Sequence, residues 1–314
     1  MKKFIFKLLI FCLLFLAVDR CLILLRNYVP QLESDKRLEK VINKEIKSDI
    51  LVFGSSRGAR NILASQIADS LKQTAFNLSY PGGDIEFQNF VLKQVLKYHT
   101  PKMIILSMDD DSELKKSENI LYRYDRLYPL VKYPIVRDEL VRKGEKNPYL
   151  IDLFIFHQLN KSNFDLRKRR STTEEKLLPC GSMPLLEQTK DFKKVYSDSI
   201  RDYNAKAEIP EKRDFFLEFI HLCELHHIEL VIVFPPNFFR PSEEFSKRIA
   251  MLAGKSPRIM HYDNIRKEYH DASFFNDRNH LKIDGAAVFT NEIIGFIKND
   301  SLNAKKQNTS EAAF

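Results

Sequence analysis

A short apolar stretch that ends in Gly54-Ser55-Ser56 constrains the fold of this chain more than any other feature. Residues 49–53 are mostly large and apolar, which is typical of a buried strand, and Gly54 ends the run. Residues 61–71 then carry apolar side chains at helical spacing. A strand that leads through a turn into a helix is the first half of a strand–helix–strand unit.

The same alternation continues along the chain. Further strands are predicted at 75–79, 102–108, 229–236 and 258–263, and further helices at 87–98, 212–227 and 284–297. Strands that alternate with helices at short intervals favour a parallel sheet with crossover helices. We therefore predict an α/β domain that spans residues 48–298.

Residues 110–204 interrupt this alternation with charged and aromatic residues that show no clear period. This interval is too long for a simple connection, so it predicts an inserted helical cap or binding region. The basic run at 167–170 lies inside it and is expected to be a solvated loop. Binding of an anionic polymer or lipid head group is the alternative for that run.

The N-terminus predicts a membrane anchor at residues 1–26. Residues 4–25 are almost entirely apolar, and about 20 such residues suffice to span a bilayer. Lys2, Lys3 and Lys7 precede or begin the run, so the N-terminus should stay in the cytoplasm and the rest be exported. A cleaved signal peptide is the alternative, but no small-x-small cleavage site ends the run.

Charges close to the anchor lead to three expectations. Asp19-Arg20 should lie at the outer membrane interface or, alternatively, contact a membrane partner, because charges at membrane depth are costly. Residues 27–47 are expected to form a charged juxtamembrane helix. Residues 299–314 are polar and are expected to be a disordered tail.

The composition of the chain bears on which partners it can bind. The net charge of +8 comes from scattered basic runs without interleaved aromatic residues, which disfavours nucleic acid and favours a surface near anionic lipid. Of the four cysteines, Cys180 and Cys223 lie in the domain and are expected to be independent thiols, with a disulfide as the alternative. No metal-ligand spacing is present, and we predict neither a metal nor a cofactor.

Three residues predict a nucleophilic site. In an open parallel sheet, functional groups lie outside the carboxyl ends of the strands. Ser56 would end the first strand and begin a helix, where backbone N–H groups favour negative charge, and for this reason we prefer it to Ser55. Because serine needs an adjacent base, His280 is the candidate base and Asp277 its orienting carboxylate.

Other residues would complete this site. The amide of Ser56 and that of Gly82 or Gly83, after the second strand, are the candidate oxyanion donors. Arg57 follows the nucleophile, and Asp109 follows the third strand, so both are candidate substrate-binding residues.

These motifs resemble those of the SGNH/GDSL hydrolase superfamily. The residues that carry the resemblance are Phe53-Gly54-Ser55-Ser56-Arg57, the run from Asn77 to Gly83, Asp277-Arg278-Asn279-His280-Leu281 and Gly285. The Gly-Ser-Ser variant behind an anchor is similar to the DltD-like and AlgJ-like envelope members. The resemblance covers roughly residues 48–109 and 210–298. It implies a flavodoxin-like three-layer α/β/α sandwich with Ser56, His280 and Asp277 as the triad.

The resemblance also implies a setting: acyl-ester chemistry on a cell-envelope glycan or lipid-linked polymer, at the inner membrane of a bacterium, often beside a membrane-bound O-acyltransferase. Two departures stand out. Ser55 replaces the usual aspartate, and the acidic residues 109–111 stand where a Gly-x-Asn-Asp block supplies a third oxyanion donor. Two hypotheses follow, a serine esterase or acyltransferase and a non-catalytic binding or scaffold protein of the same fold.

Overall fold

The computed structural model describes residues 1–109, 112–167, 176–187, 189, 192 and 195–311, with side chains as far as 299. It consists of two compact units, Met1–Glu39 with Arg123–Arg170 and Lys40–Tyr122 with Ser171–Phe314. The insert predicted at 110–204 is thus divided between the units, and its middle part, Arg123–Arg170, belongs with the N-terminal segment.

The second unit is built on a five-stranded sheet in the order β2-β1-β3-β4-β5. Its strands are β1 (Ile50–Phe53), β2 (Ala75–Asn77), β3 (Met103–Ser107), β4 (Glu229–Phe234) and β5 (Arg258–His261). All neighbouring strands run parallel, which confirms the predicted α/β class. The order is the one found in flavodoxin-like doubly wound sheets, where the strand order reverses between β1 and β3.

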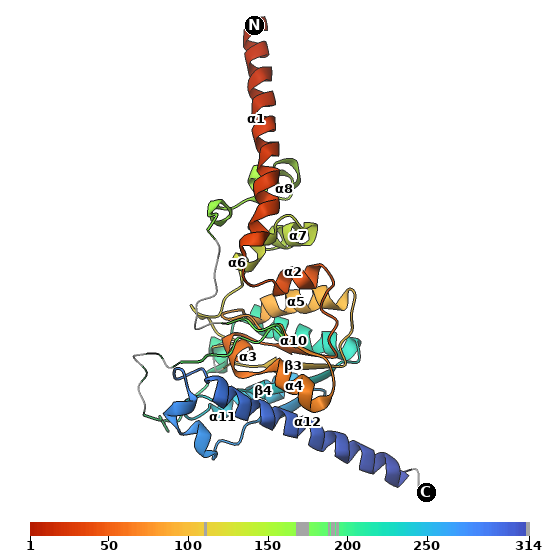
Figure 1. Ribbon diagram of the computed structural model, residues 1–314, viewed down its shortest axis with the longest axis vertical. Helices are drawn as coiled ribbons and strands as arrows, with labels where there is room; N and C mark the ends of the chain where they lie inside the picture. Colours follow the sequence, from red (N-terminus) through yellow and green to blue (C-terminus); the bar gives the residue numbers. More distant parts are fainter. Residues whose placement is uncertain (110–111, 168–175, 188, 190–191, 193–194, 312–314) are drawn as a thin grey trace. The chain divides into compact units, whose positions relative to one another are not determined.

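Helices cover both faces of this sheet (Figure 1). On one face α5 (Ile85–Leu96) packs against α10 (Pro210–Leu225), and α11 (Glu243–Ala253) packs beside α10. On the other face α3 (Ser56–Asn61) and α4 (Ala64–Leu71) pack against α12 (Ile283–Glu311). Short 3₁₀ turns lie in the connections, η4 (Ala205–Ala207), η5 (Lys267–Tyr269) and η6 (Ala272–Phe274).

Strand β1 shows how the sequence builds both halves of the core. Successive side chains of a strand point to opposite faces of the sheet. Ile50 and Val52 join the cluster that contains Phe289 of α12, whereas the ring of Phe53 meets that of Phe219 of α10 edge-on at 5.4 Å between centroids. A strand that is buried on both faces therefore has an unbroken run of apolar residues. For this reason β1 could be predicted from the sequence.

Two helix predictions need correction. The helix predicted at 61–71 is interrupted, because Ile62 takes an extended backbone and separates α3 from α4. The segment 299–314 was expected to be disordered, but α12 continues to Glu311. Residues 299–311 contain several strong helix formers and neither glycine nor proline, so nothing in them ends the helix.

The first unit begins with α1 (Lys2–Tyr28), followed by η1 (Val29–Leu32) and by α2 (Arg37–Ile42), which ends in the second unit. The single helix predicted at 27–47 is therefore wrong; Pro30 and a turn at Asp35, whose carboxylate accepts the Arg37 N–H, divide it. The rest of the unit comprises α6 (Tyr124–Leu127), η2 (Tyr128–Leu130), α7 (Pro134–Arg142), α8 (Leu150–Leu153), α9 (Ile155–Gln158) and η3 (Lys161–Phe164).

Residues Lys2–Leu32 are long and apolar enough to cross a membrane. Asp19, within that segment, is buried against α9 of its own chain.

Arg167 is exposed and pairs with Asp165, whereas residues 168–170 of the basic run lie outside the described residues.

Both domain cysteines are free thiols, as expected. Cys180 is half-buried and Cys223 is buried. Burial raises the pKa of the Cys223 thiol to about 12. This thiol is therefore protonated and unreactive at neutral pH.

Candidate active site

The turn between β1 and α3 presents Ser56 at the first position of the helix. Gly54 makes this turn possible, because its φ of +151° disfavours side chains and a Cβ there would lie 2.7 Å from the Cβ of Ser107. The turn therefore lies directly against the end of β3. This is the carboxyl end of the sheet, where we predicted the site from the sequence.

His280 and Asp277 approach Ser56 from the loop before α12. The Nε2 atom of His280 lies 2.8 Å from the Oγ of Ser56. The Nδ1 atom lies 2.8 and 3.0 Å from the two carboxylate oxygens of Asp277. The structure thus brings together three residues that are up to 224 positions apart in the sequence.

The carboxylate of Asp277 is held in its ionised form. Burial by itself raises its pKa, but the hydrogen bond and charge of His280, together with the N–H groups of Asn279 and His280, outweigh this and leave the pKa below its ordinary value. An ionised carboxylate favours the tautomer in which Nδ1 carries the proton. Nε2 is then the acceptor that faces the Ser56 hydroxyl.

Two asparagines fix the serine helix in place. Oδ1 of Asn61, at the end of α3, accepts the N–H of Leu281 at 3.1 Å and so ties the helix to the histidine loop. The side-chain amide of Asn77 donates to the carbonyls of Gly58 and Ile62 at 2.9 and 3.1 Å. Sequence reasoning gave neither residue a positioning role, because a single asparagine carries no spacing signal.

Part of the predicted insert also holds this helix. The N–H of Met183 donates to the Ala59 carbonyl at 2.7 Å. The Ser182 hydroxyl donates to the Ile62 carbonyl at 2.9 Å and accepts the Ala64 N–H at 3.0 Å. Ser182 thereby satisfies the backbone groups at the break between α3 and α4.

The two serines of the turn have different partners. The hydroxyl of Ser55 donates to the carboxylate of Asp109, which is buried at the end of β3. Only Ser56 of the two is hydrogen-bonded to His280 in the described contacts. Asp110 and Asp111, the other acids predicted near this position, lie outside the described residues.

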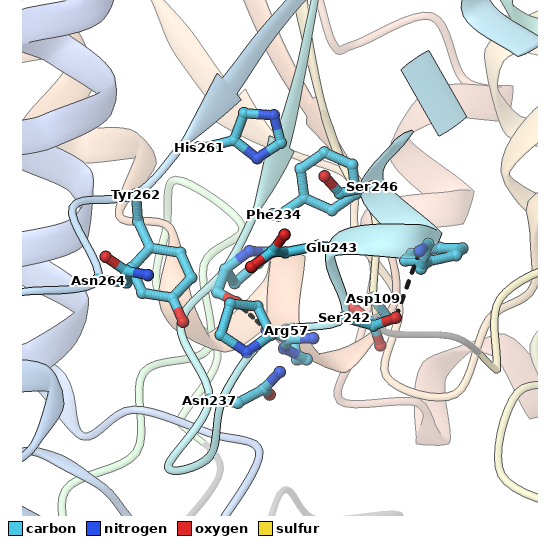
Figure 2. Close-up of a pocket in the computed structure, with 13 residues that line it drawn as sticks. Arg57, Asp109, Phe234, Asn237, Ser242, Glu243, Ser246, His261, Tyr262 and Asn264 are labelled. Carbon is cyan, nitrogen blue, oxygen red and sulfur yellow. Dashed lines mark hydrogen bonds between the residues drawn. The ribbon is translucent and has the colours of Figure 1, made fainter. Parts of the chain in front are cut away.

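Arg57 is buried, and its guanidinium donates to the carbonyl of Pro235 at the end of β4. It lines a cavity of about 330 Å³ together with Asp109, Phe234 and Tyr262 (Figure 2). The cavity lies at the carboxyl ends of β4 and β5. Neither Ser56 nor His280 lines it, so it adjoins the triad without containing it.

The glycines expected to supply an oxyanion donor lie in a turn after β2. Gly82 has a φ of +71°, which glycine adopts readily. The N–H of Gly83 donates to the Tyr80 carbonyl at 2.8 Å and is therefore used within the turn. The role of a second oxyanion donor thus stays a prediction for Gly82.

A second hollow of about 350 Å³ adjoins the histidine loop and is lined by Ser197, Arg201, Phe239, Arg278 and Asn279. The guanidinium carbons of Arg201 and Arg278 lie 4.7 and 5.6 Å from the centre of the Phe239 ring. The Arg278 carbonyl accepts the Phe238 N–H at 2.9 Å, which fixes the loop. Two guanidinium groups at one hollow are suited to an anion.

Within the described parts of the chain, no group of three or more His, Cys, Asp or Glu side chains is placed to hold a metal ion. No protein-family profile matches the chain, and no curated protein sequence is significantly similar to it.

Proposed function

We propose that this protein is a membrane-anchored serine esterase or O-acyltransferase of the SGNH type, with Ser56 as nucleophile, His280 as base and Asp277 as orienting acid. The observation that carries the proposal is the 2.8 Å contact between His280 Nε2 and Ser56 Oγ, with the other ring nitrogen bound to a carboxylate. A nucleophile, a base and an orienting group within hydrogen-bond reach are the signature of an activated serine.

In the first half of the reaction, Ser56 Oγ attacks the carbonyl carbon of an ester while Nε2 of His280 takes the hydroxyl proton. Asp277 stabilises the imidazolium. The carbonyl oxygen becomes an oxyanion, for which the amides of Ser56 and Gly82 are the proposed donors. The ester C–O bond then breaks, and the leaving alkoxide receives the proton from His280, so that the acyl group remains on Ser56.

In the second half, a hydroxyl-bearing acceptor attacks the acyl-Ser56 ester. His280 takes the proton of the acceptor and returns it to Ser56 as the acyl–enzyme bond breaks. Water as the acceptor gives hydrolysis, whereas a sugar or polyol hydroxyl gives transfer. The same residues serve both outcomes, and access of water decides between them.

The proposed substrate is an acylated cell-envelope polysaccharide or lipid-linked polymer that carries anionic groups. The hollow with Arg201 and Arg278 supports an anionic substrate, since Arg278 lies within the turn from Asp277 to His280. The apolar helix α1 supports attachment to the inner membrane of a bacterium with the second unit outside the cytoplasm. A membrane-bound O-acyltransferase is the proposed partner.

One observation favours a second candidate, a non-catalytic binding or scaffold protein of that acyltransferase. The carboxylate of Asp109 accepts the hydroxyl of Ser55, next to the nucleophile. An ionised carboxylate so close to the reacting carbonyl would oppose an oxyanion. The scaffold function requires α1 and the two hollows but not the hydroxyl of Ser56.

Complementation separates the two candidates. A strain that lacks the gene is supplied with the wild-type protein, Ser56→Ala or Ser55→Ala, and the ester-linked acyl content of its envelope polymers is measured. We expect Ser56→Ala to fail while Ser55→Ala restores the acyl content in part or in full. Full complementation by Ser56→Ala would contradict catalysis and support the scaffold function.

A further inference from the structure

Large apolar side chains are exposed in residues 149–166 of the first unit, which contain α8, α9 and η3. Tyr149, Leu153, Phe156, Phe164 and Leu166 are 84, 53, 62, 50 and 55% exposed. They fall within 18 consecutive positions of the chain. Such a concentration of exposed apolar groups marks an interaction surface rather than ordinary water-exposed protein.

Asp19 ties these helices to α1. Its side chain is only 1% exposed, and its carboxylate accepts the N–H groups of Ile155 and Phe156 at 3.1 and 2.8 Å. Arg20 donates to the Leu153 carbonyl at 3.0 Å. The first N–H groups of a helix have no partner within it, and in lipid each one left unsatisfied costs several kcal/mol. Asp19 removes this cost for two N–H groups of α9.

The segment that contains α8 and α9 contacts α1 over several helical turns. The ring of Phe15 meets that of Phe154 edge-on at 5.7 Å, and Arg26 donates to the side chain of Gln158 at 2.9 Å. Phe15 to Arg26 corresponds to roughly 16 Å along a helix. The contacts of residues 153–158 with α1 therefore extend over a length of α1 equal to about half the thickness of a bilayer core, which is ~30 Å.

The register of α1 gives the depth of this contact. With Lys2 and Lys3 at the cytoplasmic interface, a hydrocarbon core that takes about 20 residues extends from Phe4 to near residue 24. Phe15 and Asp19 then lie within the outer half of the membrane. The segment fixed to them lies at the same depth, with helical backbone in α8 and α9 and polar partners supplied by Asp19 and Gln158.

We infer that residues 149–166 are a second membrane contact, in which α8, α9 and η3 enter the outer leaflet beside α1 and place Leu153 and Phe156 against the lipid chains. The inference rests on the proposed membrane anchor. Lys161 lies between Phe156 and Phe164, and Arg167 follows Leu166, so both cations can reach the level of anionic head groups. The segment covers the part of α1 where its buried charge lies, so Asp19 is never presented to lipid.

The chain contains no tryptophan, so single substitutions give specific fluorescent reporters. Full-length Phe156→Trp, Phe11→Trp and Ile265→Trp are reconstituted in phosphatidylcholine–phosphatidylglycerol vesicles whose lipids carry bromine on the acyl chains. Phe11 reports on α1, and Ile265, which is 83% exposed in the second unit, is the matched exposed control. We expect at least twofold quenching of Phe156→Trp and Phe11→Trp and none of Ile265→Trp.

The three tryptophan variants distinguish a failure of the second membrane contact from a failure of the membrane anchor. Quenching of Phe11→Trp without quenching of Phe156→Trp would overturn the second contact and leave the anchor standing. If neither is quenched, the anchor itself fails, whereas the reactivity of Ser56 is measured independently. Unquenched Phe156→Trp that crosslinks in cells to an integral membrane protein would overturn lipid contact in favour of a protein partner.

A second variant tests the role given to Asp19. Asp19→Leu removes the acceptor for the N–H groups of Ile155 and Phe156 while keeping α1 apolar. We expect it to reduce the quenching of Phe156→Trp at least twofold and to leave that of Phe11→Trp unchanged. Unchanged quenching at both positions would show that Asp19 does not hold the segment in the membrane.

Discussion

At the scale of single residues, the site depends on which partner each polar group has. Ser55 and Ser56 are neighbours of the same type, yet one donates to Asp109 and the other faces His280. The difference arises from position, because Ser55 is the residue before α3, with no side-chain capping bond, and Ser56 is the first residue of the helix. Substitutions at these residues should therefore have sharply different effects on chemistry.

Asp277→Asn tests the orienting carboxylate. An asparagine at this position can donate to Nδ1 of His280 and favour the tautomer that places the proton on Nε2, so we expect kcat for ester hydrolysis to fall by a factor on the order of 10⁴. The KM should change little. Steady-state hydrolysis of an activated ester by the full-length protein in detergent measures both constants.

The matched control is Asp271→Asn, since Asp271 is exposed and accepts the N–H of Ser273 near the same loop. It should leave kcat within about twofold of the wild type. Equal losses in the two variants would mean that general damage to the loop, and not the tautomer of His280, explains the effect.

At the scale of elements, the β1–α3 turn is held by its close approach to β3. Gly54→Ala places a Cβ 2.7 Å from the Cβ of Ser107 at a φ of +151°. We expect the free energy of unfolding to fall by about 2 kcal/mol or more and ester hydrolysis to be lost. Urea unfolding followed by circular dichroism measures the stability.

Gly295→Ala is the complementary change, because a Cβ at this position in α12 meets no atom within 4 Å. Alanine favours a helix by about 1 kcal/mol over glycine, so this variant should be at least as stable as the wild type. If Gly54→Ala were also tolerated, the turn would not be confined in the way described.

The connection that follows α1 contains a buried ion pair. Arg37 donates to the two carboxylate oxygens of Asp35 at 2.9 and 2.7 Å, and both side chains are almost inaccessible to water. Burial raises the pKa of Asp35, but the charges and hydrogen bonds of Arg37 and Arg126 outweigh this and lower it to about 2. The pair therefore stabilises the fold only while Asp35 is ionised.

This gives a pH dependence with a definite sign. Because the folded pKa is depressed, the stabilisation is present above the ordinary value of 3.8 and is lost as the pH falls toward about 2. Asp35→Asn should cost about 3–5 kcal/mol at pH 7 and much less near pH 2. Urea unfolding at the two pH values measures the change, with the exposed Asp69→Asn as control. A penalty independent of pH would contradict the assigned pair.

At the scale of the whole molecule, the parts predicted from sequence are those with a local signal. Every strand of the sheet lies within a predicted run. The signal is clearest for β1, β3 and β4, because a strand buried on both faces is a continuous apolar segment. The meeting of Ser56 with His280 followed from chain order and from the rule that functional groups lie at the carboxyl ends of strands.

The rest depended on contacts between distant segments. The burial of Asp19 against α9 requires residues more than 130 positions away, and a charge in an apolar run does not reveal its partner. The contact of Ser55 with Asp109 and the bracing of α3 by Ser182 are of the same kind. The division of the insert between two units likewise could not be predicted, because no periodic pattern in the sequence marks it.

The most direct test of the central claim is covalent labelling of the full-length protein in detergent with a fluorophosphonate, read by intact mass and peptide mapping. An activated serine attacks the phosphorus and displaces fluoride, leaving one adduct per chain. We predict an adduct on Ser56 that is absent in Ser56→Ala and in His280→Ala and retained in Ser55→Ala. A folded protein that acquires no adduct, or one labelled on Ser55, would contradict it.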